Sequence, residues 1–362
     1  MNQKTMNMIL IPAIFLFSCG TGSDKEGKRE KTKIKIEFVK NDTEKRVDVM
    51  AGGKLFTSYL WHDPVVMDIK KPVLCPIITS AGTDVARGYP LNPRPGERVD
   101  HPHQIGLCFN YGHVNGYDFW NNSTAIPAER RDRYGTINHV SIEKMSGGSK
   151  GKGLMITHES WVDPSGKELL AERTEYHFIA EGQKRIIDRI TTLTATGGDV
   201  AMKDTKEGGF GIRVARQLEL PSEEELILTD AQGNPETVKK MSNDGISGNY
   251  RSSEGITGEA VYATRGTWVN LYGNIGNEKI SVVMIDHPKN PGSPTYWHAR
   301  GYGLLLANPL GAGTYSNGKD VMNFSIPAGK SATFRFRLIV NSGSVLSDDE
   351  INDYAEDFAG QY

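Results

Sequence analysis

The feature that most constrains the fold is a run of segments between residues 139 and 195 in which apolar and polar residues alternate. Alternation at a period of two residues indicates strands with one buried face. Residues 140–145, 154–161, 168–180 and 184–195 are the predicted strands. Asp-Pro-Ser-Gly at residues 163–166 and Glu-Gly-Gln at residues 181–183 separate them and favour tight turns. The sequence therefore predicts an antiparallel meander here.

The same pattern recurs along most of the chain. Further strands are predicted at residues 33–40, 46–50, 54–61, 73–80, 267–272, 280–285 and 330–340. The 40 Gly and 17 Pro residues favour many turns. Residues 229–258 are predicted to be a polar loop or lid. A capping box, Ser347 to Glu350, predicts one helix over residues 348–358. We therefore expect an all-β fold, one large two-sheet β-sandwich over residues 33–362 with one C-terminal helix.

The N-terminal residues carry targeting signals. Residues 1–18 are expected to be a signal peptide, because an apolar run too short to span a bilayer follows Lys4. Residues 16–19, Leu-Phe-Ser-Cys, resemble a bacterial lipobox, which implies cleavage before Cys19 and lipidation of its thiol. An ordinary secretory signal is the alternative. Residues 19–32 are then a flexible tether, and the protein is expected in the cell envelope, held to a bacterial membrane by its lipid alone.

The net charge indicates which partners to expect, and the cysteine content indicates whether disulfides support the fold. The formal net charge of -2 gives no basic field for a nucleic acid, so none is expected as a partner. Beyond Cys19 only Cys75 and Cys108 remain, and both have apolar neighbours. We expect them to be buried free thiols rather than a disulfide framework.

Residues 100–120 contain three of the nine histidines, namely His101, His103 and His113. If residues 101–109 are extended, alternation places His101 and His103 on one face with Ile105, Leu107 and Phe109. A face that changes from histidine to apolar side chains is typical of a pocket rim. The alternative is that His101 and His103 are structural histidines that brace a loop.

A second stretch repeats this pattern, and a third lies between the two. Alternation over residues 297–309 places His298, Arg300, Tyr302 and two leucines on one face. The glycine-rich residues 204–213 carry Lys206, Glu207 and Arg213 between strands. Because the inner faces of distant strands meet across a sandwich, we predict that His101, His103, His298 and Arg300 line one pocket.

Four motifs resemble a known family. Asp-His-Pro-His-x-x-Gly-Leu (residues 100–107), Val-Asn-Gly-x-Asp-Phe-Trp (114–120), Asp-Thr-Lys-Glu-Gly-Gly-Phe-Gly-Ile-Arg (204–213) and Trp-His-x-Arg-x-Tyr-Gly-Leu-x-x-Ala-Asn-Pro (297–309) occur in this order. They resemble bacterial proteins labelled PmoA-like, a domain of unknown function, over residues 73–336. Gln104 stands where many relatives are expected to have a third histidine. The resemblance implies a sandwich of the galactose-mutarotase type, with a concave sugar-binding face, in a carbohydrate-use system.

The residues suit acid–base chemistry on a sugar. The expected catalytic residues are His101, His103, His298, Arg300, Glu207 and Lys206. The expected substrate-binding residues are His113, Asn115, Asp118, Trp120, Arg213, His287, Trp297, Tyr302 and Asn308. Trp120 and Trp297 are proposed to stack on the sugar, and Arg213 and Arg300 to clamp a uronic-acid carboxylate or to stabilise an enolate.

Structural roles are the alternatives at these positions. Both tryptophans could belong to the core, Lys206 and Glu207 could form a surface ion pair, and Arg300 could brace Asp286 or Asp118. At the level of function, the hypothesis is a hydrolase, lyase or epimerase, and the alternative is a sugar-binding protein without catalysis. No cofactor is predicted. A metal ion on His101 and His103 with His298 or Glu207 is a further alternative, which matches the oxygenase label of the family.

Overall fold

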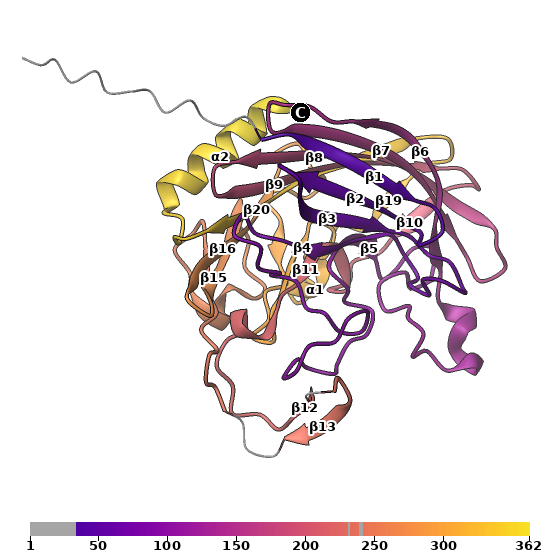
Figure 1. Ribbon diagram of the computed structural model, residues 1–362. Coiled ribbons are helices and arrows are strands. Elements are labelled where there is room, and N and C mark those ends of the chain that lie inside the picture. The colour runs from indigo at the N-terminus through magenta and orange to yellow at the C-terminus, as the bar shows by residue number, and fades with distance from the viewer. Residues whose placement is uncertain (1–33, 231, 239–241) are drawn as a thin grey trace, which may run out of the picture. The chain divides into compact units, whose positions relative to one another are not determined.

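The alternating segments pair into two large antiparallel sheets in the computed structural model, which describes residues 34–362 except 231 and 239–241 (Figure 1). The first sheet runs in the order β1 (Ile36–Asn41), β2 (Arg46–Ala51), β3 (Lys54–Leu60), β4 (Val73–Ile77), β5 (Leu107–Tyr111), β11 (Gly208–Arg213), β18 (Leu304–Asn308), β17 (Tyr296–Trp297). The second runs β14 (Asn249–Ser252), β15 (Trp268–Ile275), β16 (Glu278–Asp286), β20 (Ser331–Ser342), β9 (Lys184–Ala195), β8 (Glu168–Glu181), β7 (Lys152–Val162), β6 (Thr136–Ser146). The prediction of an all-β, two-sheet fold is confirmed.

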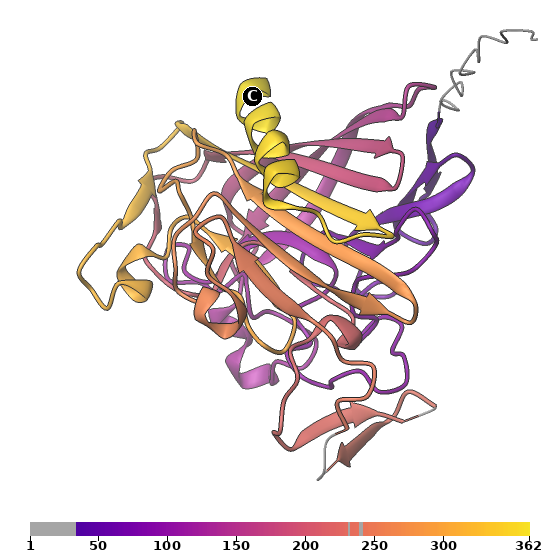
Figure 2. The ribbon, with the colours of Figure 1, turned by 90° about the vertical axis from the view of Figure 1, so that its left-hand side faces the viewer.

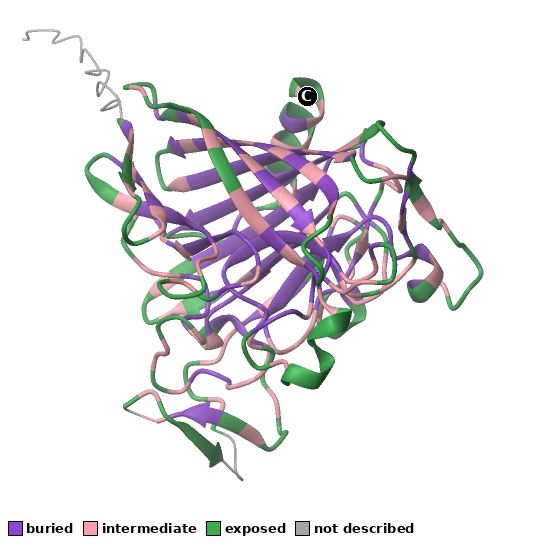
Figure 3. Ribbon diagram, turned by 90° about the vertical axis from the view of Figure 1, so that its right-hand side faces the viewer, coloured by how far each residue is buried: buried purple, intermediate pink, exposed green. Residues whose placement is uncertain are grey.

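Most predicted strands lie within a few residues of the observed ones. Strands β6 to β9 form the expected meander, and β9 has the predicted bounds. The segment 229–258 differs from the prediction. It contains the end of β12 (Leu226–Thr229), β13 (Pro235–Val238) and β14, and the β12–β13 hairpin projects from the two large sheets with much of its surface exposed (Figure 3). β13 is Pro-Glu-Thr-Val and β14 is Asn-Tyr-Arg-Ser, and strands so short and so polar show no clear period in the sequence.

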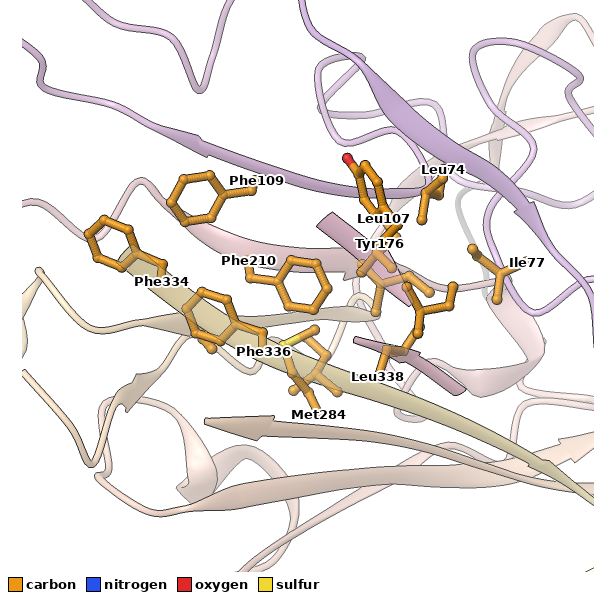
Figure 4. Close-up of a cluster of buried hydrophobic side chains, with 14 of the residues drawn as sticks. Leu74, Ile77, Leu107, Phe109, Tyr176, Phe210, Met284, Phe334, Phe336 and Leu338 are labelled. Carbon is orange, nitrogen blue, oxygen red and sulfur yellow. The ribbon is translucent and has the colours of Figure 1, made fainter. Parts of the chain in front are cut away.

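The core lies between the two sheets. Phe109 of β5 and Phe210 of β11 face Phe334 and Phe336 of β20, with ring centroids 5.4 Å apart for Phe109–Phe334 and 5.2 Å for Phe210–Phe336 (Figure 4). All four rings are at most 4% exposed. Full burial of an aromatic side chain contributes about 1.5–3 kcal/mol, so this layer fixes the two sheets against each other.

One helix covers the outer face of the second sheet. Helix α2 (Asp348–Gln361) lies across the strands (Figure 2) and buries Ile351 and Phe358 against them. Its predicted capping box is confirmed: the Ser347 side chain accepts from the Glu350 amide, and the Glu350 carboxylate accepts from the Ser347 amide at 2.9 Å. The remaining helical segments are α1 (Ala312–Tyr315) and 3₁₀ turns at Ala128–Arg133, Arg216–Leu218 and Gly258–Val261.

A polar network is buried in the same core. This inter-sheet network consists of Tyr59, Glu159, Trp161, Glu172 and Arg189. Arg189 lies 2.6 Å from one Glu172 oxygen, and Trp161 Nε1 donates to the other at 2.7 Å. The Tyr59 hydroxyl, from the first sheet, donates to Glu159 of the second at 2.7 Å. Burial, and then the charge of Glu172, raises the pKa of Glu159 to about 8, so this carboxyl is mostly protonated at neutral pH.

Two small sheets of two strands each lie outside the two large ones. β10 (Val200–Met202) pairs with β19 (Phe324–Ile326). Cys75 and Cys108 are buried free thiols, as predicted. The predicted signal peptide, Cys19 and the predicted tether lie outside the described residues. Within the part of the chain that the structure describes, no helix is both long and apolar enough to cross a membrane.

Candidate functional site

The two histidine-bearing motifs meet on neighbouring strands of one sheet. β11 pairs with β5 on one edge and with β18 on the other, which brings residues 100–120 and 296–309 together. The His298 amide donates to the Leu306 carbonyl, and the Arg300 amide to the Leu304 carbonyl. Leu304 and Leu306 form a cluster separate from the core, with Trp120 and Tyr302. His298 and Arg300 therefore lie on the outer face of the first sheet.

This position corrects the predicted geometry. We expected the two motifs to face each other across the sandwich, but they share the outer face of one sheet. The predicted alternation from residue 101 is also wrong, because β5 begins at Leu107 and residues 101–106 form a turn and a loop. His101 has a φ of 43°, a left-handed conformation that few residues other than glycine adopt. Ile105 packs on the outer side, whereas Leu107 and Phe109 face the core.

Two buried arginines hold the 100–104 loop in place. The Arg87 guanidinium donates to Asp100 Oδ1 at 2.6 Å and to the carbonyls of His101 and Gln104 at 3.0 Å each. Arg213 donates to Gln104 Oε1 at 2.7 Å and lies 2.9 Å from Asp100 Oδ1. Burial alone would raise the pKa of Asp100, but the His101 hydrogen bond and the charges of Arg213 and Arg87 hold it well below its usual value. The loop conformation is thus set by charge-assisted hydrogen bonds.

A continuous row of rings and one guanidinium runs over this face, and we call it the outer-face cluster: His103, His101, Tyr302, Arg300, Tyr262 and His298. The rings of His103 and His101 are 5.7 Å apart, and His101 stacks on Tyr302 at 5.2 Å. Arg300 lies 5.6 Å from the Tyr302 ring and 4.8 Å from the Tyr262 ring. Tyr262 meets His298 edge-on at 5.3 Å. The structure thus connects all four residues predicted to line one pocket.

The hydrogen bonds of His298 determine which ring nitrogen carries the proton. Its Nδ1 lies 2.9 Å from the Lys206 carbonyl and 3.2 Å from the Tyr315 hydroxyl. Because a carbonyl oxygen can only accept, Nδ1 carries the hydrogen. Burial lowers the pKa of His298 to about 4, so the ring is neutral at pH 7 and Nε2 has a free lone pair. Nε2 makes no hydrogen bond with a described residue.

Arg300 is the unpaired cation of the cluster. Its guanidinium rests over two tyrosine rings and forms no ion pair or hydrogen bond with any described residue, Asp286 and Asp118 included. The Glu259 carboxylate lies beside Gly301, yet outside ion-pair distance of Arg300. The side chain is half-buried, so a ligand can reach it.

Lys206 and Glu207 lie beside this cluster, in the loop that enters β11. Lys206 Nζ is 3.8 Å from Glu207 Oε1, a partly exposed ion pair. Burial raises the pKa of Glu207, and the charges acting on this carboxyl include those of His101 and Arg300. Glu207 can therefore hold a proton close to the cluster.

His103, at one end of the cluster, and Trp120, which contacts it, are both buried. His103 is 8% exposed and its Nε2 has no partner among the described residues, nor has Trp120 Nε1. Burial, and then the charge of Lys71, lowers the pKa of His103 to about 2. Lys71 is also buried and donates to the Trp120 carbonyl at 3.0 Å. The site therefore has cations and donors below it as well as at its surface.

Several predicted binding residues lie elsewhere or make structural contacts. Trp297 is fully buried in the core, and His287 packs against Phe358 of α2 on the second sheet. Asn115 bonds to residues 199 and 201, Asp118 accepts from the amides of residues 120 and 121, and Asn308 donates to the Thr205 carbonyl. His113 is half-buried just after β5. Tyr302 alone of this group belongs to the outer-face cluster, with Arg213 beneath its ring at 4.5 Å.

Sequence reasoning missed Tyr262, Tyr315, Arg87 and Lys71. Asp100 was visible in the Asp-His-Pro-His motif, and its place before two histidines is a usable signal. Tyr262 follows a 3₁₀ turn in a segment without a motif, so nothing local marks it. For a metal, the described residues contain no group of three or more His, Cys, Asp or Glu side chains placed to hold one.

The comparisons with known proteins concern family and fold. Residues 46–356 match a family described as being of unknown function, DUF6807. No curated protein matches the sequence. Similar solved structures include the galactosidase domain of the alpha-galactosidase–sucrose kinase AgaSK, at 11% identity and TM-score 0.39, covering 84% of this chain and 41% of that one.

Two further solved structures are similar at the same level. One is the alpha-galactosidase AgaA of Geobacillus stearothermophilus, at 9% identity and TM-score 0.34, covering 79% of this chain and 39% of that one. The other is a proposed aldose 1-epimerase of Escherichia coli K12, at 11% identity and TM-score 0.31, covering 84% and 98%. At these scores none of the likenesses bears on the chemistry of the site.

Proposed function

We propose that this chain, which belongs to the family of unknown function DUF6807, binds a sugar at the outer-face cluster and acts on it by acid–base chemistry. The observation that carries the proposal is His298, whose Nδ1 is held by a backbone carbonyl while Nε2 stays free beside an unpaired arginine. A ring fixed in one tautomer, with its second nitrogen open, is the arrangement of a general base. We also propose that the chain is related to the proteins labelled PmoA-like, on the basis of the four sequence motifs.

The other roles follow from position and charge. Glu207 is the proton donor, because burial keeps its carboxyl protonated to higher pH than usual. Tyr262 and Tyr302, rather than Trp120 and Trp297, supply aromatic surface for the sugar, because both tyrosines are half-buried and both tryptophans are at most 1% exposed. Hydrolysis, elimination and epimerisation all use such an acid and base.

The test is a glycan panel incubated with the wild type and with His298→Asn. Asparagine keeps a donor near the position of Nδ1 and removes Nε2. We expect turnover, measured as new reducing ends, unsaturated products or anomer exchange, to fall at least about 100-fold, well beyond what the modest loss of thermal stability from a smaller buried side chain explains. His177→Asn, a half-exposed histidine on β8, is the matched control and should keep full turnover.

Two results would contradict the proposal in different ways. If His298→Asn turns over as fast as wild type, His298 is not the base. If the wild type binds sugars from the panel without any turnover, the protein is a sugar-binding protein without catalysis.

We also propose that Cys19 anchors the protein to a membrane of the cell envelope through a lipid. The lipobox-like residues 16–19 support this. Cys19→Ser should move the protein from the membrane fraction to the soluble fraction, and retention in the membrane would disprove lipid anchoring at this residue.

A further inference from the structure

We infer that the sugar recognised at the outer-face cluster carries a carboxylate, and that Arg300 is the residue that binds this carboxylate. The inference rests on the proposed sugar-binding function and adds the chemical class of the ligand. It follows from the balance of charge around the site, from the accessibility of Arg300 and from the rings that hold its guanidinium in place.

The carboxylates near the 100–104 loop are already engaged. Asp100 pairs with both Arg87, at 2.6 Å, and Arg213, at 2.9 Å. Glu219 pairs with Arg98 at 2.6 Å and lies 3.9 Å from Arg213. Two acids are therefore shared among three buried arginines. No carboxylate in this group is left to neutralise a further cation.

Two more cations in the same region have no acidic partner among the described residues. Lys71 is buried and donates to a backbone carbonyl only. The Arg300 guanidinium lies over two tyrosine rings and forms no ion pair or hydrogen bond with a described residue. The surplus positive charge is felt by the histidines, because Lys71 lowers the pKa of His103 and Arg300 lowers that of His298, in each case after burial. Asp118 and Glu207 lie in the same region, but among the described residues neither is within ion-pair distance of Lys71 or Arg300. The unpaired charge of Arg300 therefore favours an anionic ligand over a neutral one.

Arg300 is the cation that a ligand can reach. Lys71 is 1% exposed, whereas Arg300 is half-buried at the rim. Arg213 was an alternative carboxylate clamp, but its side chain is fully buried and occupied by Asp100 and Gln104. The Arg300 guanidinium lies over the Tyr262 and Tyr302 rings, and its N–H groups make no hydrogen bond with a described residue. A planar fork of donors matches a carboxylate in two parallel hydrogen bonds.

A carboxylate on Arg300 would also assist the proposed base. His298 and Arg300 both contact Tyr262, and the Arg300 charge disfavours protonation of the imidazole. Neutralising that charge with the ligand removes part of this penalty. The base then accepts a proton more readily when an acidic sugar is bound than when a neutral sugar is bound.

The experiment is isothermal calorimetry of the purified protein with three matched probe sets: hexuronate oligosaccharides, the corresponding neutral hexose oligosaccharides and 6-sulfated hexose oligosaccharides. We expect hexuronates to bind and the neutral set to bind at least about 10-fold more weakly. Arg300→Gln should weaken hexuronate binding about 10-fold to 100-fold, and Arg300→Lys less, because lysine keeps the charge but not the fork. Arg265→Gln, which also removes a guanidinium from a tyrosine ring, is the control and should bind as wild type.

The outcomes separate this inference from the proposed function. Equal or tighter binding of neutral sugars, unaffected by Arg300→Gln, would overturn the carboxylate assignment and leave sugar binding standing. Tighter binding of the sulfated set would also overturn it, in favour of a tetrahedral anion. Hexuronate binding that survives Arg300→Gln would overturn the role of Arg300. Binding of none of the three sets would overturn the inference and the proposed function together.

Discussion

The inter-sheet network and the outer-face cluster use similar side chains in opposite ways. Both regions combine tyrosine with arginine, and a tryptophan belongs to the network and another lies against the cluster. In the inter-sheet network Arg189 pairs with Glu172, and Trp161 Nε1 donates to the same carboxylate. In the outer-face cluster Arg300 pairs with no described residue, and Trp120 Nε1 beneath it has no acceptor.

This difference separates a structural role from a binding role. A polar group left without a partner costs free energy when it is buried. The inter-sheet network satisfies Arg189, Trp161 and Glu172 internally, and of its buried atoms it leaves Glu159 Oε2 without a partner among the described residues. The Arg300 guanidinium, in contrast, is half-buried, so a ligand can supply the acceptor that the described residues do not. The comparison predicts that substitutions in the network act mainly on stability, and that those in the cluster act mainly on binding.

The largest expected effect is that of Arg189→Leu. The substitution leaves the buried Glu172 carboxylate without its cation, which should lower the free energy of unfolding by about 3–5 kcal/mol in urea titrations. The double variant Arg189→Leu with Glu172→Met should recover much of this loss, because it removes the unpaired charge as well. A loss of less than about 1 kcal/mol in the single variant would show that the network is not a structural unit.

A smaller effect is expected in the pH dependence of the free energy of unfolding, and it arises from the Glu159 carboxyl group. Its pKa is raised from 4.5 to about 8, because burial and the Glu172 charge disfavour ionisation. The folded state thus holds this proton more tightly than the unfolded state, so the stabilisation is fully present below about pH 4.5 and is lost as the pH rises through about 8. The unfolding free energy of wild type minus that of Glu159→Gln should fall by roughly 4 kcal/mol between about pH 5 and about pH 9. The subtraction cancels the contribution of the buried histidines to the pH dependence of stability, which has the opposite sign because their pKa values are lowered. A difference that does not change with pH would contradict this.

The smallest expected effect is the difference in lost unfolding free energy when one tryptophan in each region is replaced by phenylalanine. Trp161→Phe removes a hydrogen bond to the Glu172 carboxyl group, whereas Trp120→Phe removes an Nε1 that has no acceptor among the described residues. Both lose similar ring volume, so Trp161→Phe should cost about 2 kcal/mol more than Trp120→Phe in chemical unfolding. Equal costs would mean that packing, rather than hydrogen bonding, decides both sites.

Local pattern was enough to predict the strands but not to predict which way the site residues face. Residues 184–195 alternate cleanly, and β9 has exactly those bounds. The alternation from His101 to Ile105 led to a wrong strand, because the side chain of Arg87, remote in sequence, fixes that loop. All five residues of β5 and of β18 are buried, so their sequences could not show which face meets the core. Tyr262 reaches the site from a loop, and only the tertiary fold brings it there.

The position of β20 has a consequence for how the chain is made. β20 lies between β16 and β9 and pairs with both, yet residues 196–330 are synthesised after β9 and before β20. At about 5–20 residues per second, the interval is on the order of ten seconds. During that time the β6–β9 meander has an open edge at β9, which could pair with another nascent chain. Any factor that keeps the chain extended until residue 342 has emerged should therefore raise the yield of folded protein more than one that stabilises the finished fold.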